Sequence, residues 1–207
     1  MNLSQIKKDK GSVIIFENVF TDQELKKIWE EVDFVIKKHT FLGPEHTSSA
    51  LDKGGKYMKN NKGLWLDGIY ENRQESAYLN LYKKFIEYIK EQKDQLIEKD
   101  INLKLFFNTN DDYTMVNYYD NGDYYDCHID RSCYTYLFWI YREPKSFIGG
   151  DLTFPELELS INVENNKSIL FPSWLDHKVS KVVIENESLR YEYKGRFCFS
   201  SFFHIFK

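Results

Sequence analysis

The second half of the sequence changes character after Asp100, and this change limits the folds open to the chain more than any other feature. Short aromatic or β-branched runs alternate there with turn residues, as in YTMVNYY, DNG, YTYLFWIY, IGGDLTF, KSILFP and GRFCFSSFFHIF. Aromatic and β-branched residues favour strands, and many short strands separated by turns are typical of an antiparallel sandwich or barrel. We therefore expect residues 101–207 to form a jelly-roll.

The first hundred residues predict helices that support this β-structure. After a short strand at Val13–Phe16, Thr21 is a candidate N-cap with Glu24 three residues later, followed by an apolar stripe at helical spacing. A second amphipathic helix is predicted in SAYLNLYKKFIEYIKEQKDQLIEK. At 207 residues the chain is most economically a single domain, with residues 1–100 as helical support and a lid loop and residues 101–207 as the core.

A long polar segment, Thr40 to Gly68, separates the two predicted helices. A loop of this length in a compact domain is typically a lid, a binding segment or disordered. Lys59, Asn60, Asn61 and Lys62 could donate hydrogen bonds to a substrate, and an ordinary mobile loop explains the segment equally well.

The composition of the chain argues against some classes of binding partner. The net charge of −4 counts against nucleic acid and anionic membranes, unless residues 53–62 form a local basic groove. No apolar run reaches the roughly 20 residues of a membrane-spanning helix, and residues 1–10 are too polar for a secretion signal. Cys127, Cys133 and Cys198 share no CxxC spacing, which favours free thiols in a reducing, cytoplasmic compartment.

His128 and Asp130 form a candidate metal-binding pair in YYDCHIDRS. Residues two apart in a strand point the same way, but such a pair arises often by chance. A third ligand would have to come from a distant strand, and His177 in FPSWLDHKV is the candidate. Two histidines and one carboxylate leave coordination positions open, as in non-haem Fe(II) oxygenases, although some zinc hydrolases use the same ligands.

Arg196 supplies the second element of such a site. If the cosubstrate is 2-oxoglutarate, its distal carboxylate needs a buried cation, and arginine is permanently charged and fork-shaped. In period-2 alternation Arg196 shares one face of GRFCFSSFF with Cys198 and Ser200, opposite Phe197 and Phe199.

Four motifs, VNYYDNGDYYDCHID, IGGDLTFPEL, ILFPSWLDHKV and GRFCFSSFF, together resemble the Fe(II)/2-oxoglutarate dioxygenases of the prolyl 4-hydroxylase-like branch, over roughly residues 116–203. The resemblance implies a mainly β, α+β fold with a double-stranded β-helix core of the jelly-roll or cupin type. It implies that His128, Asp130 and His177 bind iron and are catalytic, and that Arg196 and Tyr119 bind the cosubstrate. Fe(II), 2-oxoglutarate and O₂ are the implied cofactor and cosubstrates, with ascorbate as an optional addition.

The sequence departs from the family pattern in two ways. Cys198 stands where many relatives have serine, and 19 residues separate His177 from Arg196, more than is common. The extra segment IENESLRYEY would form an inserted hairpin, and it makes Arg190 a rival anchor. We prefer Arg196 because the glycine before it and the strand after it both match the family.

The resemblance implies hydroxylation of an unactivated C–H bond, with succinate and CO₂ as coproducts. The branch favours a peptidyl residue, often proline, but relatives also oxidise free amino acids and other small molecules. The main alternative is a non-catalytic jelly-roll module, lectin-like or cupin-like, that binds a metal or ligand. An isomerase or hydrolase would need a further general base, and no glutamate lies close to either histidine motif. The acidic balance counts against a nucleic-acid demethylase, and the sequence gives no oligomeric state.

Overall fold

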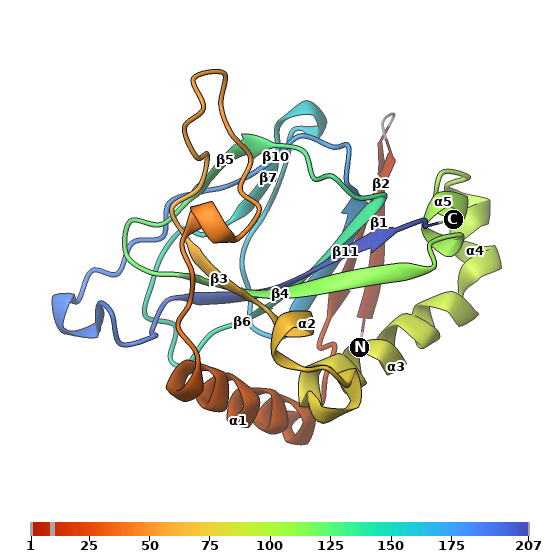
Figure 1. The fold of residues 1–207 in the computed structure, drawn as a ribbon. Helices are drawn as coiled ribbons and strands as arrows, with labels where there is room; N and C mark the ends of the chain where they lie inside the picture. Colours follow the sequence, from red (N-terminus) through yellow and green to blue (C-terminus); the bar gives the residue numbers. More distant parts are fainter. Residues whose placement is uncertain (1, 9–10, 207) are drawn as a thin grey trace.

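Two antiparallel β-sheets form the centre of the computed structural model, which describes residues 2–8 and 11–206 (Figure 1). In these residues the larger sheet has the strand order β1-β2-β9-β6-β11-β4-β3, and the smaller has the order β5-β10-β7-β8. The larger sheet contains β1 (Asn2–Lys8), β2 (Gly11–Glu17), β3 (Lys62–Trp65), β4 (Asp111–Tyr119), β6 (Tyr134–Ile140), β9 (Lys167–Pro172) and β11 (Arg196–His204). The smaller contains β5 (Tyr125–His128), β7 (Leu152–Phe154), β8 (Leu159–Ile161) and β10 (His177–Val179). The predicted mainly β fold is confirmed.

Strand β6 shows how the larger sheet separates two cores. Tyr136 and Phe138 pack in the cluster on the helix side, whereas Leu137 and Trp139 pack in the cluster that also contains residues of the smaller sheet. All of β6 is buried, which explains why YTYLFWI is largely apolar on both faces rather than alternating.

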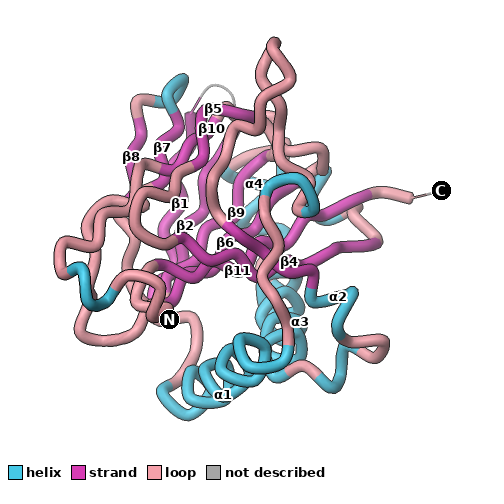
Figure 2. The backbone as a smooth tube through the Cα atoms, turned by 60° about the vertical axis from the view of Figure 1, so that its left-hand side comes forward, coloured by secondary structure: helices cyan, strands magenta, loops and turns pink. Residues whose placement is uncertain are grey.

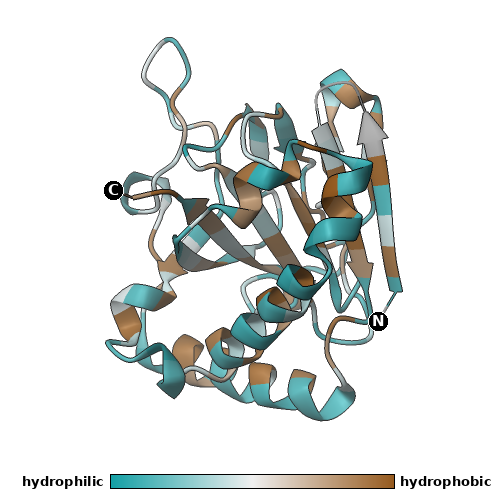
Figure 3. Cartoon of the chain, turned by 90° about the vertical axis from the view of Figure 1, so that its right-hand side faces the viewer, coloured by the Kyte–Doolittle hydropathy of each residue, from teal (hydrophilic) through white to brown (hydrophobic). Residues whose placement is uncertain are grey.

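Helices cover the outer face of the larger sheet and turn their polar sides to solvent (Figures 1 and 3). Thr21 caps α1 (Asp22–Lys38) as predicted, because the Glu24 amide donates to its hydroxyl at 3.3 Å and the Thr21 amide donates to the Glu24 carboxylate at 2.9 Å. The predicted second helix is divided at Gln92 into two helices. The helices are α1 (Asp22–Lys38), α2 (Leu66–Ile69), α3 (Ala77–Glu91), α4 (Lys93–Lys99) and α5 (Leu103–Phe107), with short 3₁₀ turns η1 (Pro44–His46), η2 (Arg73–Glu75), η3 (Pro155–Leu157) and η4 (Glu187–Leu189).

The first hundred residues contribute more than the predicted helices and loop. They also supply β1, β2 and β3, with β2 paired to β9 and β3 paired to β4. The predicted strand at Val13–Phe16 lies within β2, but residue 100 is not a boundary of the sheet. Among the described residues, no helix has the length and apolar character that a membrane crossing requires.

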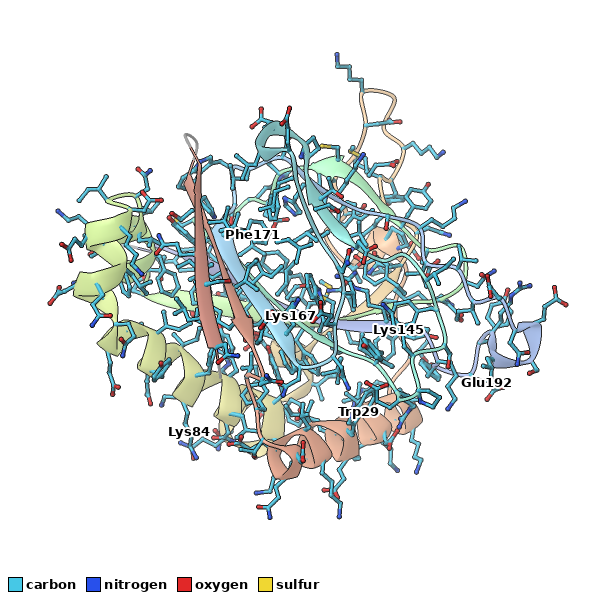
Figure 4. The ribbon with its side chains drawn as sticks, turned by 180° about the vertical axis from the view of Figure 1, so that it is seen from behind. Trp29, Lys84, Lys145, Lys167, Phe171 and Glu192 are labelled. Atoms are coloured by element: carbon cyan, nitrogen blue, oxygen red, sulfur yellow. The ribbon has the colours of Figure 1, made fainter. Side chains whose placement is uncertain are left out.

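The segment 184–193 does not form the predicted hairpin. It contains η4, and both Tyr191 and Tyr193 have positive φ, at 66° and 52°. Backbone in the left-handed region cannot continue a strand, so the segment leaves the sheet as an irregular loop. Figure 4 shows Glu192 of this loop at the edge of the molecule.

The long segment Thr40–Gly68 is attached to the smaller sheet. Lys59 forms an isolated antiparallel bridge with Tyr125 of β5, and the Asp126 amide donates to the Met58 carbonyl at 2.8 Å. Residues 51–57 extend beyond this attachment as the excursion beside β5 in Figures 1 and 2. The segment therefore brings its second half next to the strand that carries His128.

Candidate active site

His128, Asp130 and His177 converge on one point between the sheets. His128 ends β5 and His177 begins β10, and the two residues are direct partners in the antiparallel pairing of these strands. Asp130 follows β5, with its carboxylate oxygens 3.6 Å from His128 Nε2 and 3.5 Å from His177 Nε2. One ligand atom from each residue lies within 4.8 Å of the others, so the group could hold a single metal ion.

Backbone carbonyls orient both imidazoles. His128 Nδ1 lies 2.7 Å from the Asp126 carbonyl oxygen, and His177 Nδ1 lies 2.9 Å from that of Leu175. A carbonyl accepts only from a protonated nitrogen, so each Nε2 carries the lone pair that a metal requires. Burial lowers the pKa of His177 despite the nearby Asp130 carboxylate, which favours the neutral, metal-binding imidazole.

Thr135 and Ser173 hold the Asp130 carboxylate in place. The Thr135 hydroxyl donates to Asp130 Oδ2 at 2.6 Å, and the Asp130 amide donates to the Ser173 carbonyl at 2.9 Å. Burial raises the pKa of Asp130, but the histidines and the Thr135 hydroxyl outweigh it and lower the pKa to about 2. The role of Thr135 was not predicted from the sequence, in which the only signal is a hydroxyl at the start of an apolar strand.

Arg196, the predicted cosubstrate anchor, lines the same cavity and is 0% exposed. Its guanidinium carbon lies 4.7 Å from the ring centroid of Tyr119 and 5.3 Å from that of Trp139. None of its three side-chain nitrogens has a hydrogen-bond acceptor among the described residues. A buried charge without a partner is costly, so this cradle fits the distal carboxylate of 2-oxoglutarate.

Strand pairing determines which residues join Arg196 at the cavity. Strands β11 and β4 pair Arg196 with Tyr119 and Cys198 with Asn117. As the alternation predicts, Cys198 and Ser200 line the cavity, while the intervening phenylalanines pack in the helix-side core. Asn117, which sequence reasoning did not identify, donates to the Ser200 hydroxyl at 3.1 Å. Its signal was the position two residues before Tyr119 on the same strand.

Arg190, the rival anchor, points elsewhere. Its Nε donates to the Ile184 carbonyl at 3.0 Å, and its Nη1 donates to Glu187 Oε1 at 2.9 Å. Arg190 does not line the cavity. Since its own loop already satisfies this side chain, the geometry favours Arg196.

The cavity has a volume of about 410 Å³ and extends past the metal-binding group. Its lining includes the apolar side chains of Leu137, Leu152 and Val179 and a set of aromatic rings. The Trp65 and Phe202 rings pack against each other with centroids 6.0 Å apart, and the Tyr113 and His204 rings are 5.9 Å apart.

Lys59 alone among the four suggested loop donors lines the cavity. Asn61 donates to the Asn117 side chain at 3.0 Å, and Asn60 and Lys62 are exposed outside the lining. Lys59 is buried, and this burial lowers its pKa to about 8 although Asp130 opposes the shift.

Two facing sheets that enclose two histidines, one carboxylate and a buried arginine define a jelly-roll protein with a candidate metal site and an anion site in one cavity. A family model, described as the 2OG-Fe(II) oxygenase superfamily, matches residues 114–204. The match includes Tyr119, His128, Asp130, His177 and Arg196.

Solved structures with the same fold include a prolyl-4-hydroxylase from Pseudomonas putida (16% identity, TM-score 0.53, covering 94% of this chain and 93% of that one). A second is OsALKBH1 (14% identity, TM-score 0.56, covering 99% and 100%). A third is an oxidoreductase of the 2OG-Fe(II) oxygenase family from Burkholderia pseudomallei (9% identity, TM-score 0.50, covering 92% and 84%). At these identities the similarity concerns the fold. No curated protein sequence matches the chain at a significant level.

Residues 114–204, a little under half of the chain, thus match the 2OG-Fe(II) oxygenase superfamily, and the site described above fits an oxygenase of this class. Its cofactor is therefore Fe(II), and its cosubstrates are 2-oxoglutarate and O₂. The double-stranded β-helix predicted from the motifs is confirmed.

Proposed function

We propose that this oxygenase hydroxylates an unactivated C–H bond, most favourably on a peptidyl residue such as proline, with succinate and CO₂ as coproducts. In this proposal His128, Asp130 and His177 bind the metal, while Arg196 and Tyr119 bind 2-oxoglutarate. The observation that carries it is the buried Arg196 guanidinium, which has no acceptor among the described residues and lies in the cavity of the metal-binding group.

When bound, Fe(II) supplies the O₂ and electron-transfer chemistry that couples decarboxylation of 2-oxoglutarate to substrate oxidation. The residues of the chain provide ligation, orientation and exclusion of water. The two Nε2 atoms and the Asp130 carboxylate would occupy one side of the ion, leaving its other positions for ligands from the cavity. Arg196 would hold the cosubstrate with parallel hydrogen bonds, while the apolar lining excludes water.

The aromatic part of the cavity supports a substrate with an apolar ring. Trp65, Tyr113 and Phe202 offer ring faces beyond the metal-binding group, and such surfaces suit a pyrrolidine ring. The fold shared with the Pseudomonas putida prolyl-4-hydroxylase makes peptidyl proline the first substrate to test. We also propose that the chain acts as one domain and that ascorbate can serve as reductant. We further propose a cytoplasmic compartment, since the three cysteines of the chain are unpaired.

Anaerobic titration of the metal-free protein with Fe(II) and 2-oxoglutarate tests the proposed site. We expect a visible charge-transfer absorption that requires both components and disappears in His177→Ala. Iron binding without this absorption would contradict the cosubstrate assignment and point to a non-catalytic metal-binding jelly-roll. Failure to bind iron would contradict the ligand assignment.

A further inference from the structure

The charged groups of the cavity point to the chemistry of the substrate. Asp130 is the only carboxylate among the lining residues, whereas Lys59, Arg131 and Arg196 are cations. On the proposed function, the charges of Fe(II) and Arg196 balance those of Asp130 and of doubly charged 2-oxoglutarate. The positive charges of Lys59 and Arg131 are then left without a counterion, in a chain whose net charge is −4.

Lys59 says more about the substrate than Arg131 does, because Lys59 is only 6% exposed whereas Arg131 is exposed to solvent. Its ammonium donates one hydrogen bond, to the Thr47 carbonyl at 2.9 Å, and lies 5.4 Å from the ring centroid of Tyr125. It forms no ion pair with any described carboxylate. An ammonium group has three donor hydrogens, so Lys59 retains capacity to bind an acceptor in the cavity.

Tyr125 places Lys59 beside the metal-binding group. The Tyr125 ring stacks on the His128 imidazole with centroids 3.5 Å apart, and its hydroxyl accepts from the Ala50 amide at 3.0 Å. The bridge between Lys59 and Tyr125 fixes the loop on the same strand. The hydrogen bond to Thr47, the Tyr125 ring and the backbone bridge to Tyr125 therefore hold Lys59 in place. The substrate does not have to order a mobile side chain.

We infer that the substrate presents a carboxylate to Lys59, with the C–H bond to be oxidised nearby at the metal-binding group. One buried ammonium suits a single carboxylate, which forms charge-assisted hydrogen bonds with it. Recognition of a nucleic-acid backbone would require several cations along a surface. Apart from Arg196, which is assigned to the cosubstrate, the cavity adds only the exposed Arg131 to Lys59. This inference rests on the proposed function and narrows its substrate class to carboxylate-bearing amino acids or acidic peptides.

Matched probes that differ only in the carboxylate test this inference. The first pair is L-proline and L-prolinamide, and the second is an N-acetylated, C-amidated Glu-Pro-Gly peptide and its Gln-Pro-Gly analogue. Thymidine monophosphate and thymidine form a phosphate pair. Binding to the anaerobic protein with Fe(II) and 2-oxoglutarate is measured by calorimetry, and succinate formation is then measured in air.

We expect a carboxylate probe to bind at least about tenfold more tightly than its amide partner, since the amide leaves a buried charge unpaired. In Lys59→Met this preference should disappear, and Lys59→Arg should retain part of it. Lys62→Met, which removes an exposed lysine outside the cavity, is the matched control and should keep the full preference.

The outcomes separate the two proposals. Absence of the charge-transfer absorption in the unmodified protein would refute the proposed function itself. If the absorption forms, three results overturn the carboxylate inference. The carboxylate and amide probes bind equally in both pairs, or neither L-proline nor the Glu-Pro-Gly peptide binds. The third is that thymidine monophosphate binds more tightly than the carboxylate probes. The inference is also overturned if Lys59→Met raises the 2-oxoglutarate concentration needed for half of the absorption, because Lys59 would then bind the cosubstrate.

Discussion

Arg196 and Tyr119 are direct cross-strand partners, and their side chains also stack, with the guanidinium carbon 4.7 Å from the ring centroid. The ring supports the charge through its face and leaves the donors of the guanidinium free. Burial raises the pKa of the Tyr119 phenol while Arg196 opposes the shift, so the phenol stays protonated and can donate a hydrogen bond. Both side chains are thus prepared for an anion.

Arg196→Met should weaken 2-oxoglutarate binding by about 100-fold, because loss of a buried charged partner costs about 2–5 kcal/mol. The same variant should be at least as stable as the unmodified protein when no cosubstrate is present, since it removes an unpaired buried charge. Titration of the charge-transfer absorption and urea denaturation measure the two effects. Arg190→Met is the control and should change the affinity less than about twofold. Equal loss in both variants would contradict the assignment of Arg196.

Thr135→Val should weaken metal binding by about 10- to 100-fold, as is typical for a group that orients a metal ligand. The substitution keeps the shape of the side chain but removes the 2.6 Å hydrogen bond to Asp130. Thr135→Ser should restore affinity, and Thr153→Val, at an exposed hydroxyl on β7, is the matched control. A loss of unfolding free energy without a change in metal affinity would show that Thr135 is purely structural.

Asp123→Asn should remove part of the pH dependence of stability. Burial raises the pKa of Asp123 to about 6, above its value in an unfolded chain. The folded state then binds more protons than the unfolded state between about pH 4 and 6, so the free energy of unfolding falls as the pH rises. Relative to the unmodified protein, the variant should gain about 1–2 kcal/mol between pH 4.5 and 7. Urea denaturation at both values measures this gain, and a constant difference would disprove the role of Asp123.

Alternation and metal chemistry made much of the site accessible from sequence. His128 and Asp130 were linked by spacing, and Arg196, Cys198 and Ser200 by their common strand face, which the structure shows. Thr135 was not accessible, because its contact with Asp130 depends on how the chain turns between β5 and β6. Period-2 spacing describes one strand at a time and carries no information on such contacts.

The errors in the fold have a similar origin. Strand β1 was missed because NLSQIKK is largely polar, and only its pairing with β2 makes it a strand. The inserted hairpin was wrong because the backbone of Tyr191 and Tyr193 has positive φ, which their residue type does not predict. In both places tertiary contacts override local preference.

Gly195 permits the close approach of strands on which the position of Arg196 depends. A Cβ at this residue would lie 2.0 Å from the Tyr119 carbonyl oxygen, a backbone atom that cannot rotate away. Gly195→Ala should therefore separate the start of β11 from β4, lowering the unfolding free energy by about 1–3 kcal/mol.

The same separation should move the Arg196 guanidinium, so the affinity for 2-oxoglutarate should fall by at least about tenfold, because hydrogen-bond strength depends steeply on geometry. Gly68→Ala is the matched control, since a Cβ there meets only Trp65 Cβ at an ordinary 3.8 Å. Urea denaturation and titration with 2-oxoglutarate give the two quantities. If Gly195→Ala lost stability but kept full affinity, the anchor would not depend on this strand contact, and the register of β11 with β4 would not be what positions Arg196.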